Sequence, residues 1–357
     1  MISIIHIDEL LKKAVQGGAS DIHITTGIGA VARIHSKLVK LTDEVYTGEH
    51  TLYYTKQVLT EKEFKAFSEV GEYDCSYAIS GLSRFRVNVY CQRGACAIAI
   101  RVVNDVIPTI DSLKLPPIMK ELAKKPRGLI LVTGPTGSGK STSLAAMIDY
   151  INITRNSHII TIEDPIEYIH QHKSCVVNQR QIGKDSMSFS NALRGSLRQD
   201  PDIILVGEMR DLETISIALT AAETGHLVLS TLHTIGAAKT IDRIIDVFEP
   251  AQQPQVKVQL ATVVEAIISQ QLLPRVDVKG RVAAFEIMVA NPPIRALIRE
   301  GKTHQMQSVI QTSASESMIT MDAYLMNLFR QKMISEDELL SRCVDADMVK
   351  SEIPYCA

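Results

Sequence analysis

A glycine-rich segment carries the strongest chemical signal in this sequence. It fits the pattern G-x-x-x-x-G-K-[ST] across residues 134–141. The run 129–132 before it is apolar, as in a buried strand, and residues 142–148 after it favour a helix. Backbone N–H groups in such a turn, together with the positive end of the helix dipole, form a cradle for phosphates. The segment therefore predicts a nucleoside-triphosphate site rather than a chance glycine turn.

Two side chains of this segment have chemical roles of their own. Lys140 can reach the β- and γ-phosphates, and the Ser141 hydroxyl can bind Mg²⁺. The predicted nucleotide-binding residues are Gly134, Pro135, Thr136, Gly137, Ser138, Gly139, Lys140, Ser141 and Thr142. The predicted ligands are thus a nucleoside triphosphate and Mg²⁺.

A carboxylate follows the apolar run 203–206, and its position suggests hydrolysis. Gly207 and Glu208 come directly after that run. Parallel α/β sheets bind their ligands at the carboxyl ends of the strands. Phosphoryl transfer to water needs an oriented nucleophile and a metal ion. We therefore predict that Glu208 polarises the attacking water, directly or through the metal shell.

A second acidic group follows the apolar run 158–162. Glu163 could hold Mg²⁺ or its water molecules, since hard carboxylate oxygens suit that ion. Asp164 and Glu167 are weaker candidates, because an Asp-Pro pair often simply marks a turn. The predicted metal ligands are therefore Ser141 and Glu163.

A histidine and several arginines complete the candidate site. His233 follows the run 227–230 and would stand near the γ-phosphate, whereas His226 precedes that run and is the weaker candidate sensor. An arginine supplied across a subunit boundary can stabilise a transferring phosphoryl group. The arginines considered are Arg194, Arg198 and Arg210 around the Glu208 strand, and Arg84, Arg86, Arg93 and Arg101 near the N-terminus.

The elements that would position these residues fall into two domains. Residues 1–103 alternate polar and apolar, which predicts an α+β domain with an antiparallel sheet. Its predicted helices are 8–15, capped by Asp8, and a helix-like stretch 47–67, and its predicted strands are 21–25, 30–34, 73–79, 83–89 and 97–103. Residues 104–117 hold three prolines and predict a linker.

Residues 118–357 follow a different pattern. Apolar runs at 129–132, 158–162, 203–206 and 227–230 alternate with helices, which predicts a parallel sheet covered on both faces. After residue 250 the chain is predicted to be mostly helical, with one hairpin-like stretch around 272–289. A stripe at helical spacing, formed by Met321, Leu325, Leu328 and Phe329, predicts core packing.

Composition excludes several classes of protein. The chain has 357 residues, 45% hydrophobic and 22% charged, with a net charge of −2. Without a basic run, nonspecific nucleic-acid binding lacks electrostatic support. Apolar runs are too short to cross a bilayer, and the start lacks the features of a signal peptide. The six cysteines form no C-x-x-C pair, so neither a zinc site nor a disulfide framework is predicted. We expect a cytoplasmic protein.

Taken together, the motifs resemble those of the secretion and type IV pilus motor ATPases, over essentially the whole chain. Four blocks occur in the family's order, and two N-terminal segments match its first domain. The blocks are the Walker A segment 134–142, the acidic segment 160–167, the Walker B segment 200–211 and the histidine segment 224–234, and the N-terminal segments are 19–24 and 84–88. The resemblance implies an α/β fold: a P-loop, RecA-like ATPase domain with a parallel central sheet, preceded by a smaller PAS-like α+β domain.

Within this family, the chain is more similar to the retraction motors than to assembly or secretion motors. It has neither the longer N-terminal region nor the four-cysteine insertion usual in the latter. Residues 293–300 resemble the retraction block Ala-Ile-Arg-Asn-Leu-Ile-Arg-Glu, with Pro293 and Ala296 as departures. Taken alone, this block predicts an amphipathic helix start, with Pro293 suited to the first turn. The alternative is a pilus assembly or type II secretion motor ATPase.

The resemblance also implies partners and an active site. A homohexameric ring would bind ATP between subunits, and hydrolysis would drive pilus retraction and twitching motility. The motor would be cytoplasmic and would dock on an inner-membrane platform protein, its only association with the membrane. The implied catalytic residues are Glu208, Glu163, Lys140 and His233. An alternative outside the enzymes is a regulatory module, in which bound nucleotide switches a binding surface. A small-molecule kinase is less favoured, because no arginine-rich lid follows the third strand.

Overall fold

The computed structural model describes residues 4–34, 37–103 and 106–353. The chain divides into two compact units, Met1–Val106 and Ile107–Ala357. Of the predicted linker 104–117, residues 104 and 105 lie outside the described residues. Ile110 and Leu115 are buried in a hydrophobic core of the second unit. The later part of that segment therefore packs as part of the second unit.

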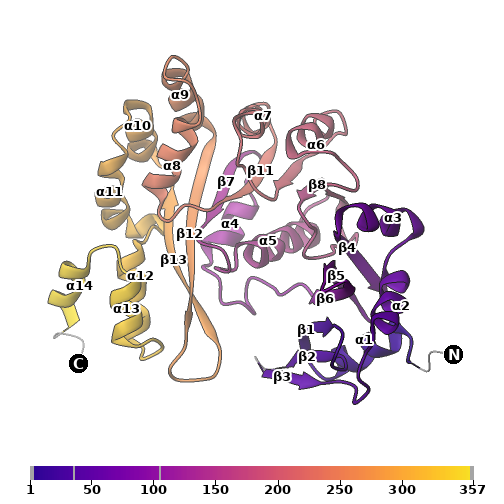
Figure 1. Cartoon of the computed structure of the whole chain (residues 1–357). Helices are drawn as coiled ribbons and strands as arrows, with labels where there is room; N and C mark the ends of the chain where they lie inside the picture. Colours follow the sequence, from indigo (N-terminus) through magenta and orange to yellow (C-terminus); the bar gives the residue numbers. More distant parts are fainter. Residues whose placement is uncertain (1–3, 35–36, 104–105, 354–357) are drawn as a thin grey trace. The chain divides into compact units, whose positions relative to one another are not determined.

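The first unit is an α+β fold with an antiparallel sheet, as predicted (Figure 1). In the part of the chain described here, its strand order is β3-β2-β1-β6-β5-β4. Its elements are α1 (Ile7–Gln16), β1 (Ala19–Ile24), β2 (Val31–Ile34), β3 (Lys37–Lys40), α2 (Gly48–Val58), α3 (Glu61–Val70), β4 (Glu72–Ile79), β5 (Ser83–Gln92) and β6 (Ala95–Val103). Apolar side chains from the sheet and from α1 and α2 share one buried core.

Three local predictions in this unit were wrong. The predicted helix-like stretch 47–67 is two helices, because Thr60 and Glu63 form a capping box that starts α3. The side chain of His6, not Asp8, caps α1 by accepting the Asp8 N–H. Strand β3 was missed, since all four of its residues are exposed and it has no buried face to impose alternation.

The second unit contains a seven-stranded sheet in the order β13-β12-β7-β11-β10-β8-β9. Neighbouring strands are parallel except β12 and β13, which form the predicted hairpin. The strands are β7 (Gly128–Thr133), β8 (His158–Glu163), β9 (Val176–Gln181), β10 (Ile203–Val206), β11 (Leu227–Leu232), β12 (Val264–Pro274) and β13 (Arg281–Val289). Strand β9 was not predicted.

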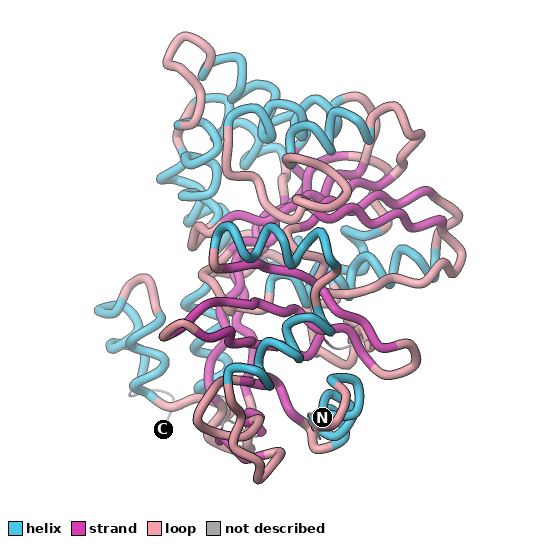
Figure 2. The backbone as a smooth tube through the Cα atoms, turned by 45° about the vertical axis from the view of Figure 1, so that its right-hand side comes forward, coloured by secondary structure: helices cyan, strands magenta, loops and turns pink. Residues whose placement is uncertain are grey.

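Helices cover both faces of this sheet, as predicted. Along β7, Leu129 and Leu131 join one hydrophobic core, with α6 to α11, while Ile130 and Val132 join the other, with α4 and α5. This division follows from the two-residue period of a strand. Figure 2 separates helices and strands by colour. The helices are α4 (Ile118–Ala123), α5 (Lys140–Thr154), α6 (Phe189–Ser196), α7 (Leu212–Glu223), α8 (Ala237–Asp246), α9 (Gln253–Val263), α10 (Pro292–Glu300) and α11 (Met306–Thr312).

The remaining helices form a C-terminal cluster against the β12–β13 hairpin. They are α12 (Met321–Arg330), α13 (Glu336–Arg342) and α14 (Ala346–Glu352), and two short 3₁₀ turns, Thr303–Gln305 and Ala314–Glu316, precede them. Met321, Leu325 and Leu328 are buried in this cluster, with Phe329 partly buried against it. The prediction of core packing for this stripe is confirmed. Within the described residues, no helix is both long and apolar enough to cross a membrane.

Candidate functional site

The glycine-rich segment forms a loop between the end of β7 and the start of α5. Gly134, Gly137 and Gly139 have positive φ angles of 140°, 78° and 89°. A Cβ atom on Gly134 would clash with the backbone carbonyl oxygen of Gln270. A Cβ atom on Gly139 would crowd the side-chain amide nitrogen of the same residue. Glycine is therefore required at these positions both by conformation and by the close approach of β12.

Lys140 lies at the first residue of α5, with its side chain folded into this loop. Its Nζ donates to the carbonyl oxygens of Gly134, at 2.9 Å, and Pro135, at 3.0 Å. Burial lowers the pKa of the Lys140 ammonium, while the nearby negative charges of Glu167 and Glu208 act in the opposite direction. The cation is thus held at the loop, near two of the predicted acidic residues.

Gln270, in the middle of β12, is a site residue that the sequence analysis did not identify. Its amide Nε2 donates to the backbone carbonyl of Ser138 at 2.7 Å. Its Oε1 accepts from the Ser143 hydroxyl at 2.8 Å. Gln270 is 3% exposed. From within the core it therefore links the glycine-rich loop, residues 134–139 and called the phosphate loop below, to the first turn of α5. Residues 269–271 are polar within an apolar strand, a signal that pointed to buried hydrogen bonds.

Replacing Gln270 with leucine is expected to weaken nucleotide binding about tenfold and to lower stability. The substitution leaves the Ser138 carbonyl and the Ser143 hydroxyl without this partner, and each buried polar group left unpaired costs about 1–3 kcal/mol. Nucleotide titration and urea unfolding measure the two effects. Gln271→Leu is the matched control, because the next residue in a strand points to the opposite face. Equal nucleotide affinity in the two variants would contradict the role assigned to Gln270.

Glu208 and His233, predicted from separate strands, lie together in the structure. Residues of β10 and β11 pair in parallel register, with Val206 opposite Ser230. His233 Nε2 lies 3.6 Å from Glu208 Oε2. The Thr231 hydroxyl donates to the Gly207 carbonyl at 2.6 Å, which fastens the two strand ends to each other.

Arg210 is the second neighbour of the Glu208 carboxylate. Its Nε lies 2.8 Å from Glu208 Oε1, with the arginine side chain 71% exposed and that of Glu208 20% exposed. A half-buried carboxylate between an imidazole and a guanidinium can hold and orient a water molecule at the sheet edge. The orientation of the Glu208 carboxylate is therefore set by two neighbours, the geometry that a general base requires.

Glu163 ends β8, next to β10 in the sheet. The Thr161 hydroxyl donates to its Oε1 at 2.6 Å, and Gln179 Nε2 donates to the same oxygen at 3.1 Å. Burial raises the pKa of the Glu163 carboxyl, and these hydrogen bonds oppose that shift. Asp164 follows directly and is exposed, whereas Glu167 is close enough to influence the charges of both Lys140 and Glu163.

Histidine 226 lies away from this group. Its Nδ1 contacts the Ala221 carbonyl at 2.9 Å, at the amino end of β11, whereas His233 follows the carboxyl end. His226 therefore lies at the opposite end of β11 from His233, the stronger of the two candidates from the sequence.

The other predicted arginines are distributed over both units. Arg194 is ion-paired with Glu213 on α7, and Arg198 is exposed. In the first unit, Arg101 is ion-paired with Asp21 at 2.9 Å. Arg86 lines a polar hollow on the sheet of that unit. Within the second unit, Arg210 is the one among the predicted arginines that contacts a predicted catalytic side chain in the described residues.

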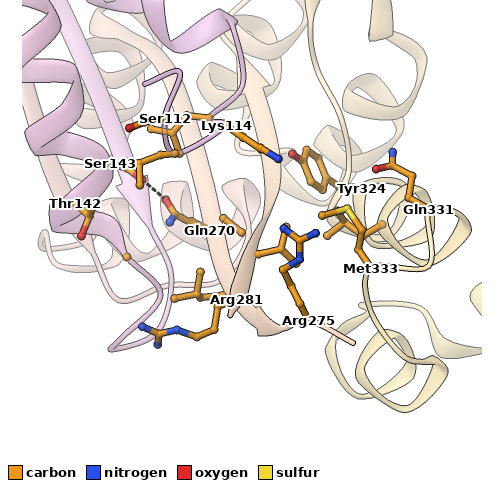
Figure 3. Close-up of a pocket in the computed structure, with 17 residues that line it drawn as sticks. Ser112, Lys114, Thr142, Ser143, Gln270, Arg275, Arg281, Tyr324, Gln331 and Met333 are labelled. Atoms are coloured by element: carbon orange, nitrogen blue, oxygen red, sulfur yellow. Dashed lines mark hydrogen bonds between the residues drawn. The ribbon is translucent and has the colours of Figure 1, made fainter. Parts of the chain in front are cut away.

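A pocket of about 650 Å³ opens beside the phosphate loop (Figure 3). Gly139, Thr142 and Ser143 line one side of it, and the segment 112–115 lines another. The hairpin contributes Arg275 and Arg281, and the C-terminal cluster contributes apolar and aromatic side chains that include Tyr324 and Met333. Its size and its apolar walls with a few polar groups suit a small organic ligand.

Comparisons with known proteins identify the family of this chain and several relatives. Residues 1–336 match the family model described as Type II/IV secretion system protein. The type IV pilus retraction ATPase PilT of Pseudomonas aeruginosa is 47% identical over 93% of this chain and 96% of its own length. A twitching motility protein of Neisseria gonorrhoeae is 45% identical over 92% of this chain and 89% of its own. A crystal structure of the pilus retraction motor PilT with bound ADP is 45% identical, with a TM-score of 0.92, and the match covers 98% of this chain and 100% of that one.

Proposed function

Since the chain belongs to the Type II/IV secretion system protein family, we propose that it is a Mg²⁺-dependent ATPase motor that drives retraction of type IV pili and twitching motility. One observation carries this proposal. Lys140, Glu163 and Glu208, the three groups that would carry out ATP hydrolysis, lie at the carboxyl edge of one parallel sheet. Sequence identity of 47% and 45% to pilus retraction motors, over 93% and 98% of this chain, supports the role in retraction.

The phosphate loop would bind the triphosphate of ATP. Backbone N–H groups of the loop and the start of α5 suit the anion, and Lys140 would exchange its two carbonyl contacts for phosphate oxygens. Glu208 would accept a proton from the attacking water, oriented by Arg210 and His233. His233, at the same edge, would also respond to the γ-phosphate.

The oxygen atoms present fit a magnesium site. Ser141 and Glu163 offer hard oxygen ligands, and the hydroxyls of Thr133 and Ser138 are buried without a hydrogen-bond partner in the described residues. Mg²⁺ binds protein through one or two side chains plus phosphates and water, so a dense cluster of protein ligands is not required. When bound, the ion neutralises charge that develops on the phosphates. Ser141 and Glu163 are the side chains that would hold it.

The pocket beside the loop would hold the base and ribose of the nucleotide. It adjoins Gly139 and Thr142, so a triphosphate in the loop can extend directly into it. Tyr324 can pack against a base, while Arg275 and Arg281 can form polar contacts with it. The segment 112–115, next to the unit boundary, would thereby respond to bound nucleotide.

The proposed working assembly is a homohexamer docked on an inner-membrane platform protein at the cytoplasmic face of the membrane. The ring would transmit the energy of ATP hydrolysis to the pilus through the platform protein. The proposed assembly does not bind nucleic acid. An arginine of the first unit would approach the ATP of a neighbouring subunit. Ring closure would then follow nucleotide state.

Removal of Mg²⁺ is expected to abolish turnover. The purified protein should hydrolyse ATP when Mg²⁺ is present, and its rate should fall to background with EDTA, because the phosphates then lack their counter-ion.

In the host, deletion of the gene should leave surface pili that no longer retract. Retraction that continues unchanged, with every paralogue also deleted, would contradict the motor role. Tight ATP binding without turnover, even with the platform partner, would instead favour a regulatory module.

The second candidate is a pilus assembly or type II secretion motor. Against it, the described residues contain no group of three or more metal-binding side chains, as a four-cysteine insertion would supply. The retraction-like block also folds as α10 despite Pro293 and Ala296, with a proline in its first turn as predicted. Arg295 of that block binds the carbonyls of Ala261 and Thr262 at the end of α9. Loss of surface pili on deletion would favour the assembly motor.

A further inference from the structure

Gln179 on β9 uses its whole side-chain amide in hydrogen bonds. Nε2 donates to the Glu163 carboxylate at 3.1 Å and to the Tyr168 carbonyl at 2.8 Å. Oε1 accepts the backbone N–H of His170 at 2.8 Å. One side chain thus connects the acidic residue at the end of β8 with the loop that follows it. Neither leucine nor glutamate could replace it, since the contacts require two donors and one acceptor.

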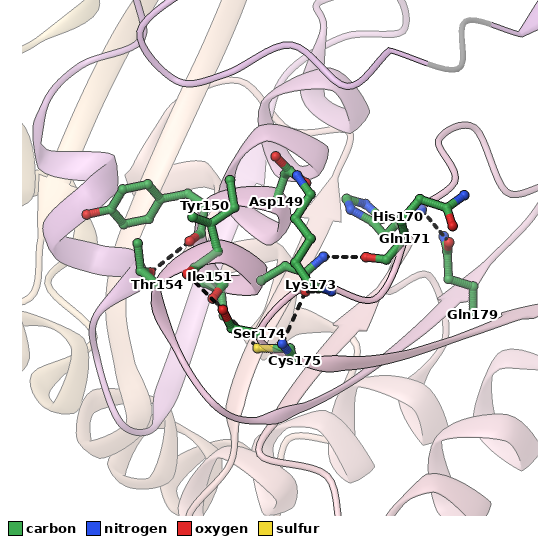
Figure 4. Close-up of polar contacts among 12 residues, drawn as sticks. Asp149, Tyr150, Ile151, Thr154, His170, Gln171, Lys173, Ser174, Cys175 and Gln179 are labelled. Atoms are coloured by element: carbon green, nitrogen blue, oxygen red, sulfur yellow. Dashed lines mark hydrogen bonds and ion pairs between the residues drawn. The ribbon is translucent and has the colours of Figure 1, made fainter.

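The same loop is fastened to the phosphate-binding helix α5 (Figure 4). Asn152 donates to the Gln171 carbonyl at 2.7 Å and accepts the Lys173 backbone N–H at 3.2 Å. Lys173 forms an ion pair with Asp149 at 2.6 Å. Asn152 and Asp149 are both buried, so these contacts hold the loop to the body of the helix.

A third contact brings this loop to the phosphate loop itself. The hydroxyls of Tyr168 and Thr142 lie 3.0 Å apart, and Thr142 is in the first turn of α5. His170, on the same loop, is 7% exposed, and burial lowers its pKa to about 4, so it is neutral at pH 7 and adds no charge near Asp149 and Lys173. Three hydrogen bonds, of 3.0, 2.8 and 3.1 Å, thus connect Thr142 to Tyr168, Tyr168 to Gln179, and Gln179 to Glu163.

We propose that Gln179 is a positioning residue that fixes the Glu163 carboxylate relative to the phosphate loop. This inference rests on the proposed function, because it assigns Gln179 to the metal side of that ATPase site. The Thr161 hydroxyl, from the same strand, and the Gln179 amide, from the neighbouring edge strand β9, both donate to Glu163 Oε1. Gln179 is the one of these two donors that also binds the loop after β8, and so it links the orientation of the carboxylate to that loop. Partners of metal-binding side chains commonly matter about 10- to 100-fold for metal affinity or activity.

The test compares Gln179→Met with Asn178→Leu in the full-length protein. Methionine has nearly the same length as glutamine but cannot form the three hydrogen bonds. Asn178 is the matched control: it is the preceding residue on β9, and its amide contacts His158 Nε2 at 2.9 Å instead of the site. Three measurements are made on each variant: kcat and KM for ATP, the Mg²⁺ concentration for half-maximal rate, and amide hydrogen exchange of residues 164–173 without nucleotide.

Gln179→Met should lower kcat about 10-fold or more, raise the half-maximal Mg²⁺ concentration, and change KM for ATP less than about twofold. It should also speed exchange in residues 164–173, with Asn178→Leu like the wild type in every measurement. Unchanged exchange, or equal losses in both variants, would overturn the inference. If the wild type itself lacked Mg²⁺-dependent hydrolysis, the proposed function would fail, and the exchange measurement would still decide whether Gln179 holds this loop.

Discussion

Replacing Glu208 with glutamine is expected to reduce kcat for ATP hydrolysis by about 100-fold or more, the scale of a lost general base. The amide keeps the shape of the side chain but cannot accept the proton of the attacking water. The nucleotide should still bind, because Lys140 and the phosphate loop are unchanged. Stability should change little, since the partner Arg210 is 71% exposed and surface ion pairs contribute about 0–1 kcal/mol.

Steady-state kinetics and nucleotide titration separate these effects. Glu213→Gln is the matched control, because Glu213 is also ion-paired with an arginine but lies on α7, outside the predicted site. A Glu208→Gln variant that turns over ATP within about threefold of the wild type would show that another group activates the water. Glu163 would then be the next residue to test.

Replacing Lys140 with methionine is expected to abolish turnover and to weaken nucleotide binding by about 100-fold, or ~2.7 kcal/mol. The buried ammonium is the positive side chain held at the loop, and methionine fills the same space without its charge. Saturating ADP at about 100 times Kd should stabilise the wild type by about 2.7 kcal/mol against unfolding. The variant should show almost none of this stabilisation at the same ADP concentration.

Lys124→Met serves as the control for a lost surface lysine. Lys124 is more than half exposed and pairs with Glu121 one turn away, at the end of α4. Thermal unfolding with and without ADP gives the comparison directly. If Lys140→Met were stabilised by ADP as strongly as Lys124→Met, the loop would not bind phosphate through this lysine.

Much of the second unit could be predicted because its signals are local. The run Ile203–Val206 is apolar at every position, which happens when a strand is buried on both faces. Strand ends of a parallel sheet share one edge, so Glu163, Glu208 and His233 were expected together before any contact was known. Strand β9 escaped notice because Val176–Gln181 has polar residues at four of its six positions and lies at the sheet edge.

Local sequence patterns predict the nucleotide site and the class of fold. The spacing of Gly134, Gly139 and Lys140 is meaningful within one turn, and strand and helix periods are read within one element. Tertiary structure alone decided which distant polar groups hold these residues in place. Gln270 reaches Ser138 across 132 positions of sequence because β12 lies beside β7, and Gln179 reaches Glu163 because β9 lies beside β8. Such hydrogen bonds depend on strand order, which no local pattern encodes.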